Sequence, residues 1–347
     1  MGLKKVEWAL IIIGAVFGIS VFYEVAFMIL APLVISIAKE AKVPYMRLGI
    51  TMVAATTLSH SLFPPQPGPT ALVDAYGADM GMVYIFGAVV FIPAVLAAGI
   101  ILPRLLKNLD RPLPPLMKQP KEFTDEEMPN FGISLLVPLI PAIMITSATI
   151  INLFIEEGSS VYTVVNFFGS AEVSLLIAVI IGIFVFGLRI GRNMTQVMDT
   201  FSDAIKGIAM IIFIVGSGGA FKEIILEAGV GDYIATLMQN SSWNPLIMAW
   251  LITVLIRIAT GTGVVSAITA AGIVGPLIPT FDVNPVLMVL ATAAGSNTIT
   301  HVNDASFWLF KEYFNLSIKD TFKTWGLLLL TTSLVGIGVV LTLDIFM

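Results

Sequence analysis

Apolar residues run through this chain in long uninterrupted blocks, and the polar residues gather between them. Residues 81–103, 131–154 and 258–281 contain no charged side chain, and residues 325–343 form another such block. A helix of about 20 apolar residues matches the hydrocarbon thickness of a bilayer. A helix on a soluble core would instead keep a polar face. The pattern predicts an all-α integral membrane protein built as a polytopic helical bundle.

Other apolar blocks are interrupted. Residues 8–38 contain one charge, Glu24, and are too long for one span and too short for two, so we expect a broken or re-entrant segment near Glu24. Residues 59–70 hold four prolines and a glycine within six positions, which predicts a non-helical, Pro-rich loop carrying His60. Short apolar pieces lie at 208–221, 243–256, 258–281 and 283–300, and all but 243–256 are interrupted by glycine, which is typical of discontinuous transporter helices.

Charges between the blocks indicate the orientation of the spans. The stretch 104–130 is rich in proline and in both charge signs, and its Lys and Arg residues place it in the cytoplasm. The loop 156–172 has no Lys or Arg and is expected outside, whereas Arg189 and Arg192 mark an inner end. We expect roughly nine to eleven apolar segments, two of them broken hairpins.

An internal repeat is indicated by the two histidines, His60 and His301. Each follows a proline, Pro44 or Pro285, at the same distance, and the common offset is 241 residues. The fold class is therefore predicted to include inverted repeats with re-entrant or broken helix hairpins. Residues 1–103 would be the remainder of a first repeat, 104–130 the cytoplasmic connector, and 131–347 the second repeat with a C-terminal span. Residues 208–237 precede the second copy and have no counterpart before Trp8, so the first repeat is expected to lack its opening helices.

Composition narrows the class further. The chain is 57% hydrophobic and 12% charged, against about a quarter charged in soluble domains. A net charge of −5 and no basic field argue against a nucleic-acid partner. With no cysteine, thiolate metal sites and disulfides are excluded, and we expect neither a metal site nor a cofactor. Lys4 and Lys5 precede an apolar run that is too long for a signal peptide and is interpreted as a span.

Candidate proton carriers are ionisable groups inside or beside apolar blocks. A carboxylate in hydrocarbon must be protonated, paired or facing a cavity, and a histidine with a pKa of about 6.5 takes up protons near neutral pH. The alternatives are an interfacial carboxylate, histidines bonded to their own turns, and capping of a helix that begins near residue 305. The proposed proton-coupling residues are Glu24, His60, His301 and Asp304.

Candidate substrate-binding residues are small and polar and lie at the predicted breaks. Hydroxyl groups, amides and backbone N–H groups at half-helix ends suit an anion, although small residues also serve helix packing. Arg257 is expected to mark the end of a span and to snorkel to the interface; a counter-ion to the substrate is the alternative. The substrate-binding set is Thr57, Ser59, His60, Thr262, Gly263, Ser296, Asn297, Thr298 and Asn303.

Several of these stretches are similar to those of the gluconate permease family, the gluconate–proton symporters of the ion-transporter superfamily. The most specific are the Pro-rich run 59–70 and His301-Val302-Asn303-Asp304, and the others are 22–25, 78–81, 218–222, 307–309 and 311–316. The resemblance covers essentially the whole chain. It implies a multi-pass permease of the bacterial inner membrane and re-entrant hairpins. Family members begin with further hydrophobic segments upstream.

The function expected from this resemblance is proton symport of gluconate or a related small hydroxy-carboxylate, with sodium left open as the coupling ion. Alternatives are a permease for D-serine or another sugar acid, and a truncated, non-transporting fragment or partner subunit. A membrane-embedded enzyme lacks a recognisable motif such as His-Glu-x-x-His, and a passive channel would not accumulate substrate. The expected partners are the anionic substrate and the lipid bilayer, and a homo-oligomer is left open.

Overall fold

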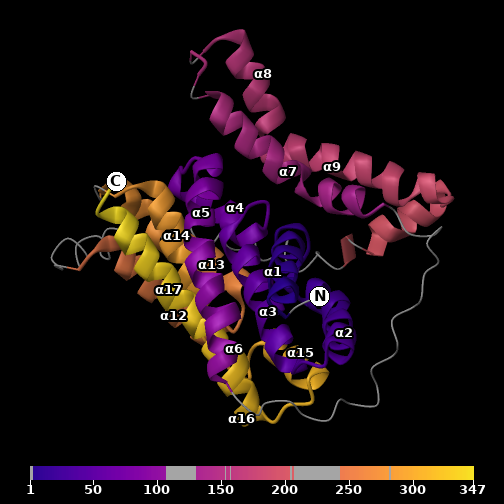
Figure 1. Ribbon diagram of the computed structural model, residues 1–347. Coiled ribbons are helices and arrows are strands. Elements are labelled where there is room, and N and C mark those ends of the chain that lie inside the picture. The colour runs from indigo at the N-terminus through magenta and orange to yellow at the C-terminus, as the bar shows by residue number, and fades with distance from the viewer. Residues whose placement is uncertain are drawn as a thin grey trace.

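The computed structural model describes residues 3–106, 130–206, 243–280 and 283–347, apart from single residues 153, 157 and 204. Within these ranges every regular element is a helix (Figure 1). The first group is α1 (Leu3–Ser20), α2 (Tyr23–Ala41), α3 (Tyr45–Leu62), α4 (Pro67–Tyr76), α5 (Met80–Val95) and α6 (Leu102–Leu105). The second is α7 (Phe131–Asn152), α8 (Ser160–Gly169) and α9 (Ala171–Phe186). The third is α12 (Pro245–Thr260), α13 (Gly263–Val274), α14 (Pro285–Ser296), α15 (Ala305–Tyr313), α16 (Ile318–Thr321) and α17 (Leu327–Asp344).

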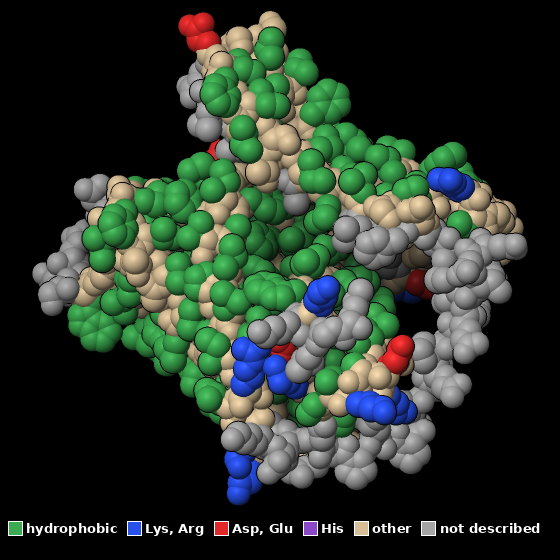
Figure 2. Space-filling model, viewed as in Figure 1, with side chains coloured by type: hydrophobic (Ala, Val, Ile, Leu, Met, Phe, Trp, Pro, Cys, Tyr) green, Lys and Arg blue, Asp and Glu red, His purple; other side chains and the backbone are tan. Residues whose placement is uncertain are grey.

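Among the described residues, three continuous helical stretches are long and apolar enough to cross a membrane. They are Met80–Leu105, Glu172–Ile190 and Ile318–Asp344. The first and last fall on the apolar blocks predicted at 81–103 and 325–343, and the middle one runs from the predicted outer loop to Arg189 at the predicted inner end. Hydrophobic side chains cover most of the visible surface, while Lys and Arg side chains gather mainly toward the lower end of the molecule (Figure 2). The prediction of an all-α membrane fold is confirmed.

The first predicted break lies beside Glu24, as expected. Helix α1 ends at Ser20 and α2 begins at Tyr23, whereas Pro32 lies within α2 without ending it. Carbonyl groups at the end of α1 have no partner inside that helix. The buried side chain of Gln66 supplies it, because its Nε2 donates to the oxygens of Gly18, Ile19 and Val21 at 2.9, 3.0 and 3.2 Å. The single side chain of Gln66 therefore stabilises the backbone at the break between α1 and α2.

The Pro-rich run is more helical than predicted. Helix α3 extends through His60 to Leu62, and α4 begins at Pro67, so only residues 63–66 are irregular. Proline is tolerated in the first turn of a helix because the N–H that it lacks would have no helical partner there. The prediction that 64–69 cannot be helix is therefore wrong for Pro67–Pro69, and His60 lies on a helix and not in a loop.

The second break lies within the predicted glycine-interrupted piece 258–281, at the sequence Thr260-Gly261-Thr262-Gly263. Helix α12 ends at Thr260, Gly261 takes φ +80°, and α13 starts at Gly263. Positive φ favours glycine because a Cβ would be strained there. The side chain of Asn303 donates to the carbonyl oxygens of Ile258 and Ala259 at 3.0 and 3.2 Å. An amide from the loop after α14 thus binds the end of α12, much as Gln66 binds the end of α1.

The described elements follow the same order before and after α7–α9. A broken pair (α1–α2, or α12–α13) is followed by one helix, then a short helix, then a long span. The long spans α5 and α17 pack side by side and run in opposite directions (Figure 1). Tyr76 of α4 and Thr292 of α14 are joined by a 3.0 Å hydrogen bond between hydroxyls. The connector residues 107–129 and the glycine-rich segment 216–219 lie outside the described residues, and the domain boundaries stay a prediction.

Both long spans contain a turn wider than an α-helix. A π-helical segment, Leu96–Ile101, joins α5 to α6, and another, Phe322–Gly326, joins α16 to α17. In the first, the carbonyl oxygen of Gly99 accepts a hydrogen bond from Thr51 Oγ1 of α3 at 2.6 Å. Nearby, the buried Glu7 of α1 binds Arg47 of α3 and Arg104 of α6 at 2.7 and 3.0 Å. These contacts fix three helices against one another at one end of the bundle.

Candidate functional site

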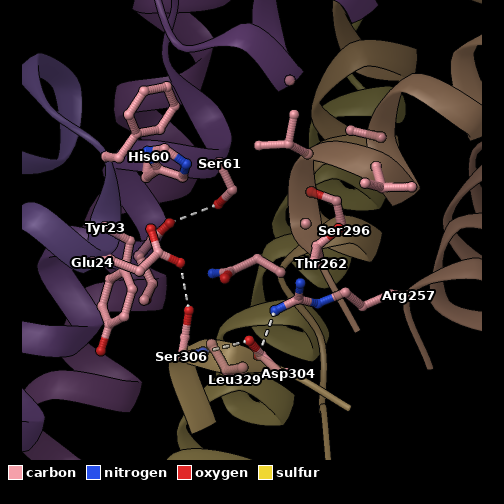
Figure 3. Close-up of a pocket in the computed structure, with 18 of the residues that line it drawn as sticks. Tyr23, Glu24, His60, Ser61, Arg257, Thr262, Ser296, Asp304, Ser306 and Leu329 are labelled. Atoms are coloured by element: carbon pink, nitrogen blue, oxygen red, sulfur yellow. Dashed lines mark hydrogen bonds and ion pairs between the residues drawn. The ribbon is translucent and has the colours of Figure 1, made fainter. Parts of the chain in front are cut away.

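A cavity of about 240 Å³ lies where the two broken helix pairs meet (Figure 3). A cavity of this size suits a small organic solute. Its walls come from α2, α3 and α4 on one side and from α12–α15 and the α16–α17 span on the other. Side chains far apart in sequence are therefore brought to one site.

The first wall combines one face of α3 with the beginning of α2. Thr57, His60 and Ser61 all line the cavity, because positions three and four apart share a helix face. The ring of His60 packs against Phe22 with centroids 5.9 Å apart, and its buried Nδ1 has no hydrogen-bond partner in the described protein. Glu24, in the first turn of α2, lines the same wall.

The second wall carries an ion pair. Arg257 Nη2 of α12 lies 3.2 Å from Asp304 Oδ2, and both side chains are buried. Asp304 also accepts hydrogen bonds from Thr300 Oγ1 at 2.8 Å and, as the N-cap of α15, from the backbone N–H of Ser306 at 2.8 Å. Asp304 is thus held on three sides. The prediction that Arg257 ends a span and snorkels is wrong, because the guanidinium is buried at the cavity wall and α12 continues to Thr260.

Four predicted substrate contacts lie on the second wall. Thr262 and Gly263 are at the break between α12 and α13, and Ser296 and Asn297 are at the end of α14. Asn297 is anchored to α17, since its Nδ2 lies 3.2 Å from Thr332 Oγ1. Ser296 Oγ donates to the carbonyl of Ala293 at 2.8 Å, which leaves its lone pairs available to a solute donor.

One hydrogen bond joins the two walls directly. Ser306 Oγ of α15 donates to Glu24 Oε1 of α2 at 2.8 Å (Figure 3). The residues are 282 positions apart in the chain. The protonation state of the Glu24 carboxyl therefore affects the hydrogen bond that joins the two walls of the cavity.

Other predicted residues lie away from the cavity lining. Ser59 is buried on the opposite face of α3 and donates to Ala55, and the buried Thr298 Oγ1 has no partner in the described protein. His301 Nε2 lies 3.1 Å from the carbonyl oxygen of Ile258, beside the Asn303 contacts already described. His301 and Asn303 therefore contact the end of α12, more than 40 residues away in the chain, and not their own turn or the start of α15 as the alternatives supposed.

The lining residues that sequence reasoning missed include Ser61, Ser306 and Tyr23. Ser61 could have been found by treating 45–62 as one helix, since it follows Thr57 by one turn. Ser306 has no local signal, because it reaches the site only through the approach of α15 to α2. Among the described residues, no three His, Cys, Asp or Glu side chains gather closely enough to hold a metal ion.

A cavity between two interrupted helix pairs inside an apolar, all-helical bundle defines a membrane transport protein. Comparison with known proteins gives the family. The model of the GntP family permeases matches residues 1–346, and the chain belongs to this family. Its relatives are named as transporters and permeases, so it is a transport protein and not an enzyme.

The relatives include a high-affinity gluconate transporter of Escherichia coli K12, 55% identical over 99% of this chain and 78% of the relative. The Gnt-II system L-idonate transporter of the same organism is 41% identical, covering 99% and 78%, and a gluconate permease of Bacillus subtilis is 40% identical, covering 99% and 79%. The crystal structure of the Alcanivorax borkumensis YdaH transporter matches with a TM-score of 0.67 at 17% identity, over 100% of this chain and 78% of that one. That likeness concerns the fold.

Proposed function

We propose that this permease is a secondary active transporter that carries gluconate, or a related small hydroxy-carboxylate, together with a proton. The observation that carries the proposal is the cavity itself, which offers hydroxyl and amide groups beside a buried cation. A polyhydroxy acid needs both kinds of partner. The names of the relatives, gluconate and L-idonate transporters, support the same substrate class.

The substrate hydroxyls are assigned to the polar groups on both walls. Thr57 and Ser61 face the cavity from α3, and Thr262, Ser296 and Asn297 face it from the second wall. These side chains donate and accept, so each can match a hydroxyl of either polarity. The glycine at 263 leaves backbone N–H groups at the start of α13 open to an approaching anion.

Glu24 is the proposed proton carrier. Its carboxylate has one hydrogen bond from a neutral hydroxyl, that of Ser306, and borders the cavity. Asp304, in contrast, accepts three hydrogen bonds, one of them from a guanidinium, so both of its carboxylate oxygens are already engaged within the protein. Charge also favours this assignment. The formal charges of Glu24, Asp304 and Arg257 at the cavity wall add up to −1. If one proton enters with each monovalent anion, the net charge of the loaded site is again −1.

The proposed location is the bacterial inner membrane, with two repeats of opposite direction. Basic residues Lys5, Arg47 and Arg104 lie at the end of the bundle formed by the starts of α1 and α3 and by α6. Asp79 and Asp344 lie at the other end, where α5 begins and α17 finishes. The positive-inside rule then puts α6 at the cytoplasmic face, and alternating access would proceed about the central cavity.

Uptake of labelled gluconate into cells expressing the full chain tests the proposal. We expect accumulation that a proton uncoupler abolishes, and competition by L-idonate. Asn297→Ala should abolish uptake while the protein stays in the membrane, whereas Asn166→Ala, on the exposed face of α8, should not. Absence of gluconate uptake with the chain present in the membrane would contradict the substrate, and sodium-dependent, uncoupler-resistant uptake would contradict the proton.

A further inference from the structure

Arg257 has more hydrogen-bond donors than the protein uses. A guanidinium carries five N–H groups. In the described structure Nη1 donates to the carbonyl oxygen of Gly261 at 2.9 Å, and Nη2 donates to Asp304 at 3.2 Å. The remaining three have no partner there, and Nε is fully buried without one. The side chain is only 7% exposed and lines the cavity.

The guanidinium points into the cavity, toward the side on which Glu24 of the first wall and Ser306 of the second wall meet (Figure 3). Gly263 borders it on one side. A Cβ added there would lie 3.6 Å from Nη1 and 3.9 Å from Cζ, so the glycine leaves this flank of the guanidinium bare. A buried cation with free donors and an open flank at the wall of a solute-sized cavity is suited to a planar anion.

We propose that Arg257 is the specificity-determining residue of the site and binds the carboxylate of the substrate, with Asp304 as its resident counter-ion. This inference rests on the proposed function and deepens it. Asp304 is fixed by Thr300 and by the start of α15, so it holds the guanidinium in place without occupying all of its donors. The incoming carboxylate shares the guanidinium with Asp304 and takes the donors that face the cavity.

The pairing explains how one cation can serve both states of the site. In the empty site, Asp304 compensates a charge that would be costly to bury alone. In the loaded site, the two carboxylates flank one guanidinium. The site therefore requires a carboxylate on its ligand, and a neutral polyol of the same length, such as sorbitol, leaves the free donors unsatisfied.

Charge variants separate this role from a merely structural ion pair. Equilibrium binding of labelled gluconate to the purified full chain in detergent is measured for wild type, Arg257→Gln, Arg257→Lys, Asp304→Asn and the double variant Arg257→Gln/Asp304→Asn. Asparagine is also a good N-cap, so Asp304→Asn keeps the start of α15 intact. The double variant has no unpaired charge in the pair and keeps the test valid if Arg257→Gln alone does not fold.

We expect Arg257→Gln and the double variant to raise the Kd for gluconate at least about tenfold, and Arg257→Lys to raise it too, because the planar fork is lost. Asp304→Asn removes the competing carboxylate and should lower the Kd by about threefold. Unlabelled sorbitol should not compete. A structural pair instead predicts that both single variants weaken binding alike and that the double variant recovers it.

The outcomes keep the two proposals distinct. If the double variant binds gluconate with the same Kd as the wild-type chain, the role of Arg257 is overturned and the proposed function stands. Equal competition by sorbitol and by gluconate overturns the requirement for a carboxylate. If the wild-type chain binds none of gluconate, L-idonate and lactate, the proposed function and this inference both fail.

Discussion

The contact between Gln66 and the end of α1 yields a stability prediction of definite size. Gln66 is buried at 5% exposure, and its amide serves the carbonyls of Gly18, Ile19 and Val21. Gln66→Leu keeps much of the volume but removes the donors. A lost hydrogen bond costs about 1 kcal/mol net, and a buried acceptor left without a partner costs about 1–3 kcal/mol. Since two N–H groups serve the three carbonyls, we expect a loss of roughly 2–4 kcal/mol.

The other half of the site supplies the matched control. Asn303 makes the corresponding contact to the carbonyls of Ile258 and Ala259, but Asn303 and both partner residues are exposed. Water can replace the amide there, so Asn303→Leu should cost less than about 1 kcal/mol. The difference between the variants measures burial and not the chemistry of the amide.

Thermal unfolding of the purified chain in one detergent compares the two variants with wild type. The midpoint should fall by several degrees for Gln66→Leu and change little for Asn303→Leu. Gluconate binding, measured well below either midpoint, should weaken in Gln66→Leu because the start of α2, with Glu24, loses its fixed position. Equal midpoints for the two variants, or a Gln66→Leu midpoint equal to that of wild type, would refute the reasoning.

Three further predictions concern single positions. Glu24→Gln should abolish uphill, uncoupler-sensitive accumulation but leave gluconate exchange in a counterflow assay. The amide oxygen can still accept the hydrogen bond from Ser306, but the side chain can no longer take up and release a proton. Loss of both activities would contradict this prediction. Gly18→Ala places a Cβ 2.8 Å from Ser59 Cβ and should lower stability by about 1–3 kcal/mol, whereas Gly338→Ala, with nothing within 4 Å, should be neutral or slightly stabilising in thermal unfolding. Glu7→Gln leaves two guanidinium groups without their carboxylate and should cost about 1–3 kcal/mol, less than a fully buried pair because both arginines are partly exposed; an unchanged midpoint would refute it.

The apolar blocks predicted the membrane fold, and the interruptions predicted where the site forms. Both signals are local: a run of about 20 apolar residues has one stable environment, and glycine or a buried carboxylate within such a run marks a place where regular helix is costly. The breaks beside Glu24 and at Gly261 were found in this way, and both border the cavity.

The errors arose where the direction of a side chain depends on its angular position on a helix or on packing against a segment far away in the sequence. The sequence pattern placed Ser59 and His60 together in one irregular loop, and both were assigned to the site. Helix α3 is regular there, so Ser59 faces away, whereas Thr57, His60 and Ser61 face the cavity. Arg257 follows an apolar run and looks like its end. The packing of α15 brings Asp304 beside Arg257, and this ion pair offsets the free-energy cost of burying the guanidinium at the cavity wall.

The π-helical turn at Leu96–Ile101 has a consequence for how this chain tolerates a change of length. Such a turn is equivalent to one residue inserted into an α-helix, and each residue of an α-helix turns the chain by about 100°. Deleting one residue there would restore a regular helix and free Gly99 of its bond from Thr51. The residues that follow would keep their angular phase, because the wider turn takes up the extra residue locally, so Arg104 would still face Glu7. We therefore expect this turn to be the position in the span at which the loss of one residue disturbs the packing of the bundle least.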